Sequence, residues 1–309
     1  DMTLQQLEYI LAVYKTGHFM KAAELCQVTQ PTLSAMIQKL EEELDCKIFD
    51  RSQHPIQATE MGEKIIRQAQ IILYQANQLK EMLLKEKESV SGNLNLAIIP
   101  TIASYLLPRF IALFRNDYPD VSLKITEMRT ETIIQKLKTA EIDMAILATP
   151  LNMPDLLEIP IYYEKFIAYI SPGESIYELK ELSANNLPLE HLWVLEEGHC
   201  FRNQIFNFCD QMKVHNYMYE AGSIETLVKI VDINGGYTVI PELHVDSLTQ
   251  EQKKNLRNIV QPEATREISI VIRDDYVREG LLNAVADSLK KIIPPHMLDS
   301  RLKKFAIKI

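Results

Sequence analysis

Residues 22–51 read AAELCQVTQPTLSAMIQKLEEELDCKIFDR, and their pattern is the strongest fold signal in the chain. Their apolar side chains recur at steps of four, three and four residues, which is the spacing of one buried helix face. Thr29 precedes this helix as an N-cap, and Pro31 stands in its first turn, where proline is tolerated. A polar break at 27–29 separates it from a short helix at 20–25, and similar spacing predicts an earlier helix over 4–14. Three helices are therefore expected, and the third buries Leu33, Ile37, Leu40 and Leu44.

The outer face of the third helix carries small and polar side chains, because each residue rotates the helix by about 100°. Such side chains suit a helix lying in the major groove of DNA, and the helix N-terminus offers N–H groups to phosphate. Residues 51–59 are expected to form a loop or wing that reaches the DNA backbone. A pair of helices from an interaction domain is the alternative for this pattern. The expected DNA contacts are Gln30, Pro31, Thr32, Ser34, Gln38 and Arg51.

The overall composition is that of a soluble globular protein, with 47% apolar and 24% charged residues. The net charge of −9, with five Lys/Arg against nine acids in the first sixty residues, does not favour nucleic acid by itself. Neither a signal peptide nor a membrane span is expected, and we therefore expect the protein in the cytoplasm. Four cysteines without a Cys-x-x-Cys clip predict no metal site. The motifs GxGxxG, GxxxxGK[ST] and HExxH are absent, so we expect no cofactor and no enzymatic activity.

Residues 22–51 resemble, over their full length, the helix-turn-helix of the LysR family of transcription regulators. The resemblance implies a winged helix-turn-helix whose third helix contacts the bases of double-stranded DNA. It also implies a role in transcription regulation, with RNA polymerase as a partner.

The segment 60–91 is expected to be a long linker helix, because it contains no proline and its only glycine, Gly62, lies in the expected first turn. A helix of about 30 residues would be roughly 45 Å long, more than a compact domain covers, so a second copy is its natural partner. A core helix of the next domain is the alternative, although charged residues flank the apolar stripe. The family resemblance implies a homodimer through this helix and a homotetramer of two such dimers. The apolar stripe consists of Met61, Ile65, Ile66, Ala69, Ile72, Leu73, Ala76, Leu79, Met82 and Leu83.

Beyond Gly92 short apolar strands alternate with helices, which predicts mostly parallel sheets covered by helices on both faces. The expected strands lie at 94–99, 121–126, 142–147, 166–170, 191–195, 217–220, 237–240 and 268–272. The expected helices follow Thr101 and Thr130, begin near His199, and span 224–233 and 276–293. Two such series suggest two subdomains with a ligand cleft between them.

The fold class expected is therefore α/β with an all-α N-terminal part. Its domains are residues 1–59 for DNA binding, 60–91 for dimerisation and 92–309 for regulation. The segments PTIASYLLPRF (100–110) and FRNDYPDVSLKI (114–125) resemble the LysR-family effector domain, whose fold is similar to periplasmic binding proteins. That fold implies two crossovers, with subdomain I at about 92–165 and 267–309 and subdomain II at about 166–266.

Two cysteines stand close together in GHCFRNQIFNFC, residues 198–209. Cys200 is at the expected start of a helix, where first-turn N–H groups and the charge of Arg202 favour the thiolate that attacks peroxide. Glu196 and Glu197 oppose this effect, and a buried structural cysteine is the alternative. Cys26 and Cys46, in the DNA-binding part, are expected to pack in its core.

The stretch 198–209 also resembles the sensing segment of the hydrogen-peroxide-responsive members of the LysR family. The resemblance implies that Cys200 is the peroxidatic cysteine and Cys209 the resolving one, in a switch that controls antioxidant genes under oxidative stress. It implies a peroxide pocket formed by Thr101, Thr130, His199, Arg202 and Arg266. Asn203 departs from the pattern, since better-known members carry an acid there. Alternatives are a regulator that binds a small organic effector and a thiol peroxidase.

The spacing of the two cysteines has a mechanical consequence. In one continuous helix their sulfurs would be about 13 Å apart along the axis. A disulfide needs Cα atoms within about 7 Å. The segment 200–209 is therefore expected to unwind when the disulfide forms.

Overall fold

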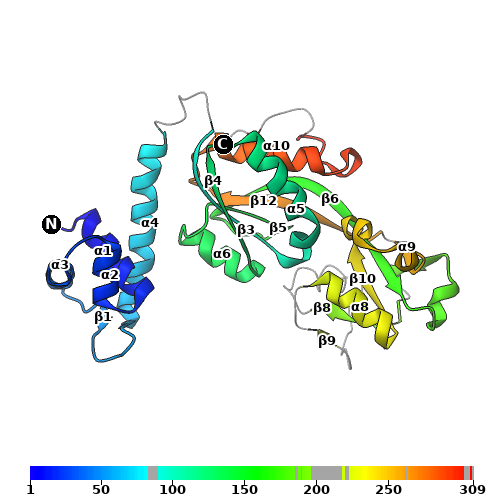
Figure 1. Ribbon diagram of the computed structural model, residues 1–309, viewed down its shortest axis with the longest axis horizontal. Helices are drawn as coiled ribbons and strands as arrows, with labels where there is room; N and C mark the ends of the chain where they lie inside the picture. Colours follow the sequence, from blue (N-terminus) through cyan, green and yellow to red (C-terminus); the bar gives the residue numbers. More distant parts are fainter. Residues whose placement is uncertain are drawn as a thin grey trace. The chain divides into compact units, whose positions relative to one another are not determined.

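The computed structural model describes residues 1–82, 90–184, 187–188, 190–195, 218–219, 223–261, 263–302 and 307. The chain divides into two compact units, Asp1–Glu86 with Lys138–Glu141 and Lys87–Leu137 with Ile142–Ile309. Figure 1 shows the first unit as a helical group and the second as a sheet with helices packed against it. Among the described residues, no helix has both the length and the apolar character needed to cross a bilayer.

The first unit contains the three expected helices, α1 (Leu4–Thr16), α2 (Phe19–Leu25) and α3 (Gln30–Glu43). The Thr29 side chain accepts a hydrogen bond from the Thr32 amide at 3.4 Å, which confirms Thr29 as the cap of α3. Strands β1 (Phe49–Asp50) and β2 (Gln57–Ala58) then pair antiparallel as a small wing. The winged helix-turn-helix is thus present.

One expected core position of α3 is wrong. Leu44 is 39% exposed, because α3 ends at Glu43 and the chain reverses at Asp45, whose φ is +49°. Glu41 is buried instead, at 2% exposure, since its carboxylate accepts hydrogen bonds from the amides of Ile48 and Phe49. Apolar spacing cannot identify a buried acid of this kind.

Helix α4 (Glu60–Met82) follows the wing, and its expected continuation lies outside the described residues. Ile66 and Ala69 are buried in the core of the first unit, whereas Leu79 and Met82 are 69% and 52% exposed. The apolar stripe therefore has two parts: the beginning of α4 packs on the DNA-binding helices, and its far end is uncovered in a single chain.

The second unit is built on an eight-stranded sheet, in the order β4-β3-β5-β12-β6-β11-β7 with β10 also pairing β6. The strands are β3 (Gly92–Ile98), β4 (Val121–Glu127), β5 (Met144–Thr149), β6 (Leu156–Ile170), β7 (Glu181–Ser183), β10 (Tyr237–Pro241), β11 (Leu256–Val260) and β12 (Thr265–Arg273). Strand β3 is parallel to β4 and β5, but β12 is antiparallel to both β5 and β6. The sheet is therefore mixed, and the expectation of mostly parallel sheets is wrong, because β12 returns across the unit in the opposite direction.

Strand β6 is longer than expected and belongs to both halves of the sheet. Its residues 156–165 pair with β12, and its residues 166–170 pair with β10 and β11. The sequence predicts only the second part, because Glu158, Pro160 and Glu164 interrupt the apolar pattern of the first. The register of the pair shifts between Ile268 and Ser269 of β12, where Ile161 is the extra residue on β6, and this irregularity accommodates Pro160.

Helices α5 (Pro100–Asp117) and α6 (Thr130–Lys138) follow β3 and β4, and α10 (Glu279–Ile292) follows β12. In the other half, α8 (Ile224–Asn234) and the short α9 (Gln250–Lys253) flank β10, and the 3₁₀ turn η4 (Glu242–Ser247) lies between them. Two further turns, η2 (Ser175–Glu178) and η5 (Pro295–Met297), connect other elements. A small parallel pair, β8 (Val194–Leu195) and β9 (Met218–Tyr219), forms a second sheet, and the residues before β8 bridge to Tyr237 of β10.

Candidate functional site

Two buried threonines mark the carboxyl edge of neighbouring parallel strands. Thr101 lies in the first turn of α5, directly after β3, and Thr130 begins α6, directly after β4. They are 2% and 9% exposed. Since β3 and β4 are parallel neighbours, their carboxyl ends meet at one edge of the sheet, where ligands bind in α/β folds.

Arg266 connects this edge to the middle of the sheet. It lies on β12, directly opposite Glu164 of β6, and its side chain is 1% exposed. Its Nε donates to Glu164 Oε1 at 2.7 Å, and its Nη1 donates to Thr101 Oγ1 at 2.9 Å. The guanidinium carbon is 5.5 Å from the centre of the Phe166 ring. The expected pocket residues Thr101 and Arg266 are thus in direct contact.

Three residues that sequence analysis missed complete this group. The Tyr105 hydroxyl donates to Glu164 Oε1 at 2.8 Å and is 3.4 Å from the Tyr162 hydroxyl. The Glu164 side chain is 0% exposed, and its Oε2 has no hydrogen-bond partner among the described residues. An acid two residues before the expected strand 166–170, and a tyrosine one helical turn after Thr101, were the available signals. We call Thr101, Tyr105, Tyr162, Glu164 and Arg266 the Arg266 cluster.

The charges of the Arg266 cluster balance. Burial and the negative charge of Glu164 raise the pKa of Tyr105 and of Tyr162, so both phenols stay protonated and act as donors. Burial alone would lower the pKa of Arg266, but the charge of Glu164, the nearby Tyr105 and Tyr162, and the hydrogen bond to Glu164 together more than offset this and raise it. One cation, one anion and neutral hydroxyls remain. Such a cluster can orient a polar ligand.

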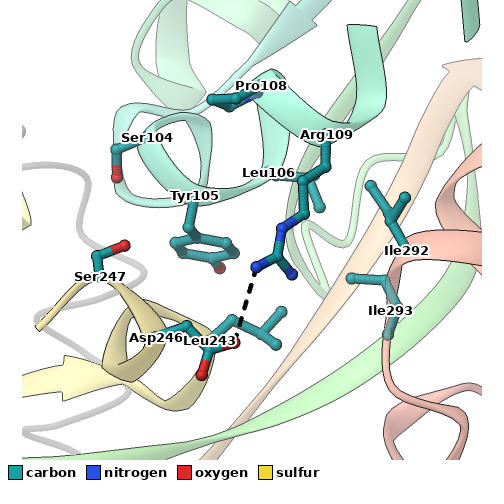
Figure 2. A pocket seen from close by; sticks show the side chains of 10 residues that line it. All are labelled: Ser104, Tyr105, Leu106, Pro108, Arg109, Leu243, Asp246, Ser247, Ile292 and Ile293. Atoms are coloured by element: carbon teal, nitrogen blue, oxygen red, sulfur yellow. Dashed lines mark ion pairs between the residues drawn. The ribbon is translucent and has the colours of Figure 1, made fainter. Parts of the chain in front are cut away.

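Two cavities flank helix α5. One of about 470 Å³ is lined by Pro100, Ala103, Ser104, Leu107, Pro108, Ile111, Glu127 and Ser223. The other, of about 210 Å³, lies between α5, η4 and the end of α10. Figure 2 shows the Tyr105 ring pointing from α5 toward η4, beside an ion pair of Arg109 and Asp246 whose atoms are 4.0 Å apart. Tyr105 is therefore shared between this cavity and the Arg266 cluster.

The other expected sensing residues lie outside the described part of the chain. These are Cys200, Cys209, His199 and Arg202, together with the departure at Asn203. Cys26 and Cys46 are described, and both are half-buried free thiols. Cys26 packs against the core of the first unit as expected, and burial raises the pKa of its thiol.

The expected DNA-binding residues form one surface of the first unit. Gln30, Pro31, Thr32 and Gln38 are exposed on α3, and Ser34 is half-buried. Arg51 donates to the Ser34 hydroxyl at 3.4 Å, and its guanidinium carbon is 4.9 Å from the centre of the Phe19 ring. This contact places the wing arginine beside α3.

Glu41, which sequence analysis did not identify, is buried behind this surface. Its buried carboxylate accepts from the Ile48 amide at 2.8 Å and is 3.7 Å from the Arg51 guanidinium. The carboxylate therefore connects the end of α3 to the wing.

Comparisons with known proteins cover both units. The model of the bacterial regulatory helix-turn-helix protein of the lysR family matches residues 4–63, and that of the LysR substrate binding domain matches residues 87–292. A protein of Haemophilus influenzae named hydrogen peroxide-inducible genes activator is 33% identical over 301 residues. The match covers 94% of this chain and 99% of the relative.

Solved structures are similar over the same length. Full-length OxyR from Pseudomonas aeruginosa, with a cysteine replaced by aspartate, has a TM-score of 0.82 at 31% identity, covering 97% of this chain and 99% of that one. OxyR from Corynebacterium glutamicum, with a cysteine replaced by serine and hydrogen peroxide bound, has a TM-score of 0.61 at 27% identity, covering 94% and 92%. With both family models matched and a relative this similar over nearly its whole length, the chain belongs to the LysR family of bacterial helix-turn-helix transcription regulators.

Proposed function

We propose that this regulator responds to hydrogen peroxide by oxidation of Cys200 and disulfide formation with Cys209. The observation that carries the proposal is the full-length similarity to proteins named for peroxide-inducible gene activation, at 33% identity in one case. The contact between Thr101 and Arg266, two residues that the family resemblance places in a peroxide pocket, is consistent with it.

The chemistry requires two thiols and one peroxide. The Cys200 thiolate attacks one peroxide oxygen, so that an S–O bond forms, the O–O bond breaks, and hydroxide leaves and takes up the proton lost by the thiol. The Cys209 sulfur then attacks the sulfenic acid, closing the disulfide and releasing a second water. Peroxide is reduced to two waters while the two thiols are oxidised, and we propose that the segment 200–209 unwinds in this step.

The pocket residues would stabilise charge and orient the peroxide. Thr101 accepts a hydrogen bond from Arg266, so its own hydrogen is free to point toward a bound oxygen. We assign Thr130 to the same pocket from its burial at the neighbouring strand end. Arg202, and His199 when protonated, would stabilise the Cys200 thiolate by their positive charge. They stand two residues and one residue from it in the sequence.

The remaining assignments concern DNA and assembly. Residues 1–59 would bind the operator through α3 and Arg51, 60–91 would join two chains, and 92–309 would sense peroxide. A homodimer presents two recognition helices, and a tetramer would pair two dimers. The protein would act in the cytoplasm, where it meets its DNA and RNA polymerase, and its purpose would be regulation rather than enzymatic peroxide removal.

A regulator that binds a small organic effector is the second candidate. The cavity of about 470 Å³ beside α5 is large enough for such a molecule and has the polar groups Ser104 and Glu127 in its lining. In that case Cys200 would be a buried thiol without a sensing role.

Thiol mapping before and after stoichiometric peroxide separates these candidates. We expect Cys200 and Cys209 to be lost as a pair, with a changed DNA footprint, while Cys26 and Cys46 stay reduced. Cys200→Ser should abolish the response and leave DNA binding intact, and Cys26→Ser serves as the matched control. An unreacted Cys200 would favour the organic effector, and rapid turnover with a reductant would favour a peroxidase.

A further inference from the structure

We propose that Glu164 and Tyr105 are positioning residues for the reaction with peroxide, because they hold Arg266 against the Thr101 hydroxyl. The inference rests on the proposed function and adds two residues to it. Neither residue was singled out by its sequence context, and both act through Arg266.

The Glu164 carboxylate is held in one orientation by its contacts. Glu164 Oε1 accepts from Arg266 Nε at 2.7 Å, is 2.7 Å from Nη2 of the same guanidinium, and accepts from the Tyr105 hydroxyl at 2.8 Å. The other oxygen, Oε2, has no hydrogen-bond partner among the described residues. Contacts at one oxygen therefore fix the orientation of the carboxylate.

The guanidinium of Arg266 is oriented in turn. Its donors form a rigid planar fork, so occupying Nε and Nη2 determines the direction of Nη1. That direction is toward Thr101 Oγ1, at 2.9 Å. Arg266 and Glu164 are directly paired on β12 and β6. The strand pairing therefore sets the distance between their backbones. Glu164 and Tyr105 thus decide which atom faces the threonine.

The Thr101 hydroxyl receives this oriented donor. A hydroxyl that accepts a hydrogen bond from a cation has its own hydrogen pointing elsewhere, and it becomes a stronger donor. Tyr105 is four residues after Thr101 on α5, one helical turn away, so the same helix carries both the donor and the residue that stabilises its orientation. Loss of the Tyr105 hydroxyl should weaken the donor without removing it.

The test is a mutant cycle on the full-length reduced protein, with the rate constant for Cys200 oxidation by hydrogen peroxide as the readout. We expect Tyr105→Phe to lower this constant about tenfold, since small losses of positioning slow reactions strongly. Alkylation of Cys200 by iodoacetamide, which reports only the reactivity of the thiol, should change by less than about twofold. In a Thr101→Val background, Tyr105→Phe should have no further effect, because the two residues act as one unit.

Two further variants complete the experiment. Glu164→Gln keeps the side-chain shape and removes the charge, and it should slow oxidation at least as much as Tyr105→Phe. If this variant fails to fold, Tyr105→Phe decides alone. Tyr163→Phe is the matched control, because Tyr163 adjoins Glu164 on β6 but donates to Asp299, at 3.0 Å. Its oxidation should match that of the unchanged chain.

The outcomes are distinct. Unchanged oxidation in Tyr105→Phe, equal losses in oxidation and alkylation, or multiplicative losses in the double variant would each overturn this inference alone. If Cys200 of the unchanged chain does not react with peroxide, the proposed function fails and the inference fails with it.

Discussion

At the scale of single residues, buried polar groups determine what the second unit can do. Arg266 and Glu164 are both almost wholly buried, and each is tolerated because the other neutralises it and a hydroxyl hydrogen-bonds to it. His244 of η4 is a third buried polar residue: it is 2% exposed, and its Nδ1 has no hydrogen-bond partner among the described residues. Its imidazole is consequently a point where protonation and folding are coupled.

We expect acid to destabilise the second unit through His244. Burial lowers the pKa of His244 below its ordinary value of 6.5, although the charge of Glu225 opposes this. A depressed folded pKa means that the unfolded chain binds the proton more readily, so this stability is present above pH 6.5 and is lost as the pH falls through the folded pKa. His244→Leu should therefore reduce the loss of stability between about pH 7.5 and pH 5.5.

The measurement is urea unfolding followed by the fluorescence of Trp193, the single tryptophan, which lies in the second unit. His296→Gln, at an exposed position of the same unit, is the control. An equal acid-induced loss in His244→Leu and in the unchanged chain would contradict the prediction.

At the scale of elements, the start of α4 depends on a close approach to the wing. A Cβ added at Gly62 would be 2.0 Å from the Ile48 carbonyl oxygen, whereas one added at Gly173 meets no atom within 4 Å. Helix propensity favours alanine over glycine by up to about 1 kcal/mol, but a backbone overlap costs more. The wing and α4 are therefore packed too closely for any side chain at this position.

We predict that Gly62→Ala lowers the stability of the first unit by about 1–3 kcal/mol and weakens DNA binding, because α4 or the wing must shift. Thermal unfolding monitored by circular dichroism and a DNA titration are the measurements. Gly173→Ala, the control, should leave both unchanged. A Gly62→Ala protein with normal stability would show that the helix start moves freely.

At the scale of the whole molecule, the exposed end of the α4 stripe is where a second chain would contribute. Leu79 and Met82 are uncovered, and the net charge of −9 provides little general attraction to DNA. Two linked recognition helices would raise the affinity of each through effective concentration. Assembly and DNA binding should consequently be lost together.

We predict that Leu79→Glu shifts the protein toward monomers and lowers operator affinity by about tenfold or more. Light scattering after size exclusion and a DNA titration would measure the two effects. Ile233→Glu is the matched control, since Ile233 is also apolar and is 82% exposed on α8. If Leu79→Glu remained a dimer, dimerisation through the linker helix would be excluded at this position.

Sequence reasoning succeeded where local signals are strong and failed where partners are distant. The cap Thr29 and the helices of the first unit follow from residues within one or two turns. The first part of β6 was missed because its acids and Pro160 break the apolar pattern, and only the pairing with β12 accommodates them. Leu44 was placed in the core because apolar spacing carries no information about where the chain reverses.

Local sequence signals specify three short helices followed by an α/β domain, because capping, apolar periodicity and turn residues act over a few neighbouring positions. The family resemblance added the winged helix-turn-helix. Only the tertiary structure decided that Glu164 stands opposite Arg266, 102 residues away, and that Tyr105 joins them. Strand register sets these contacts, and it depends on the packing of the whole sheet rather than on any local stretch.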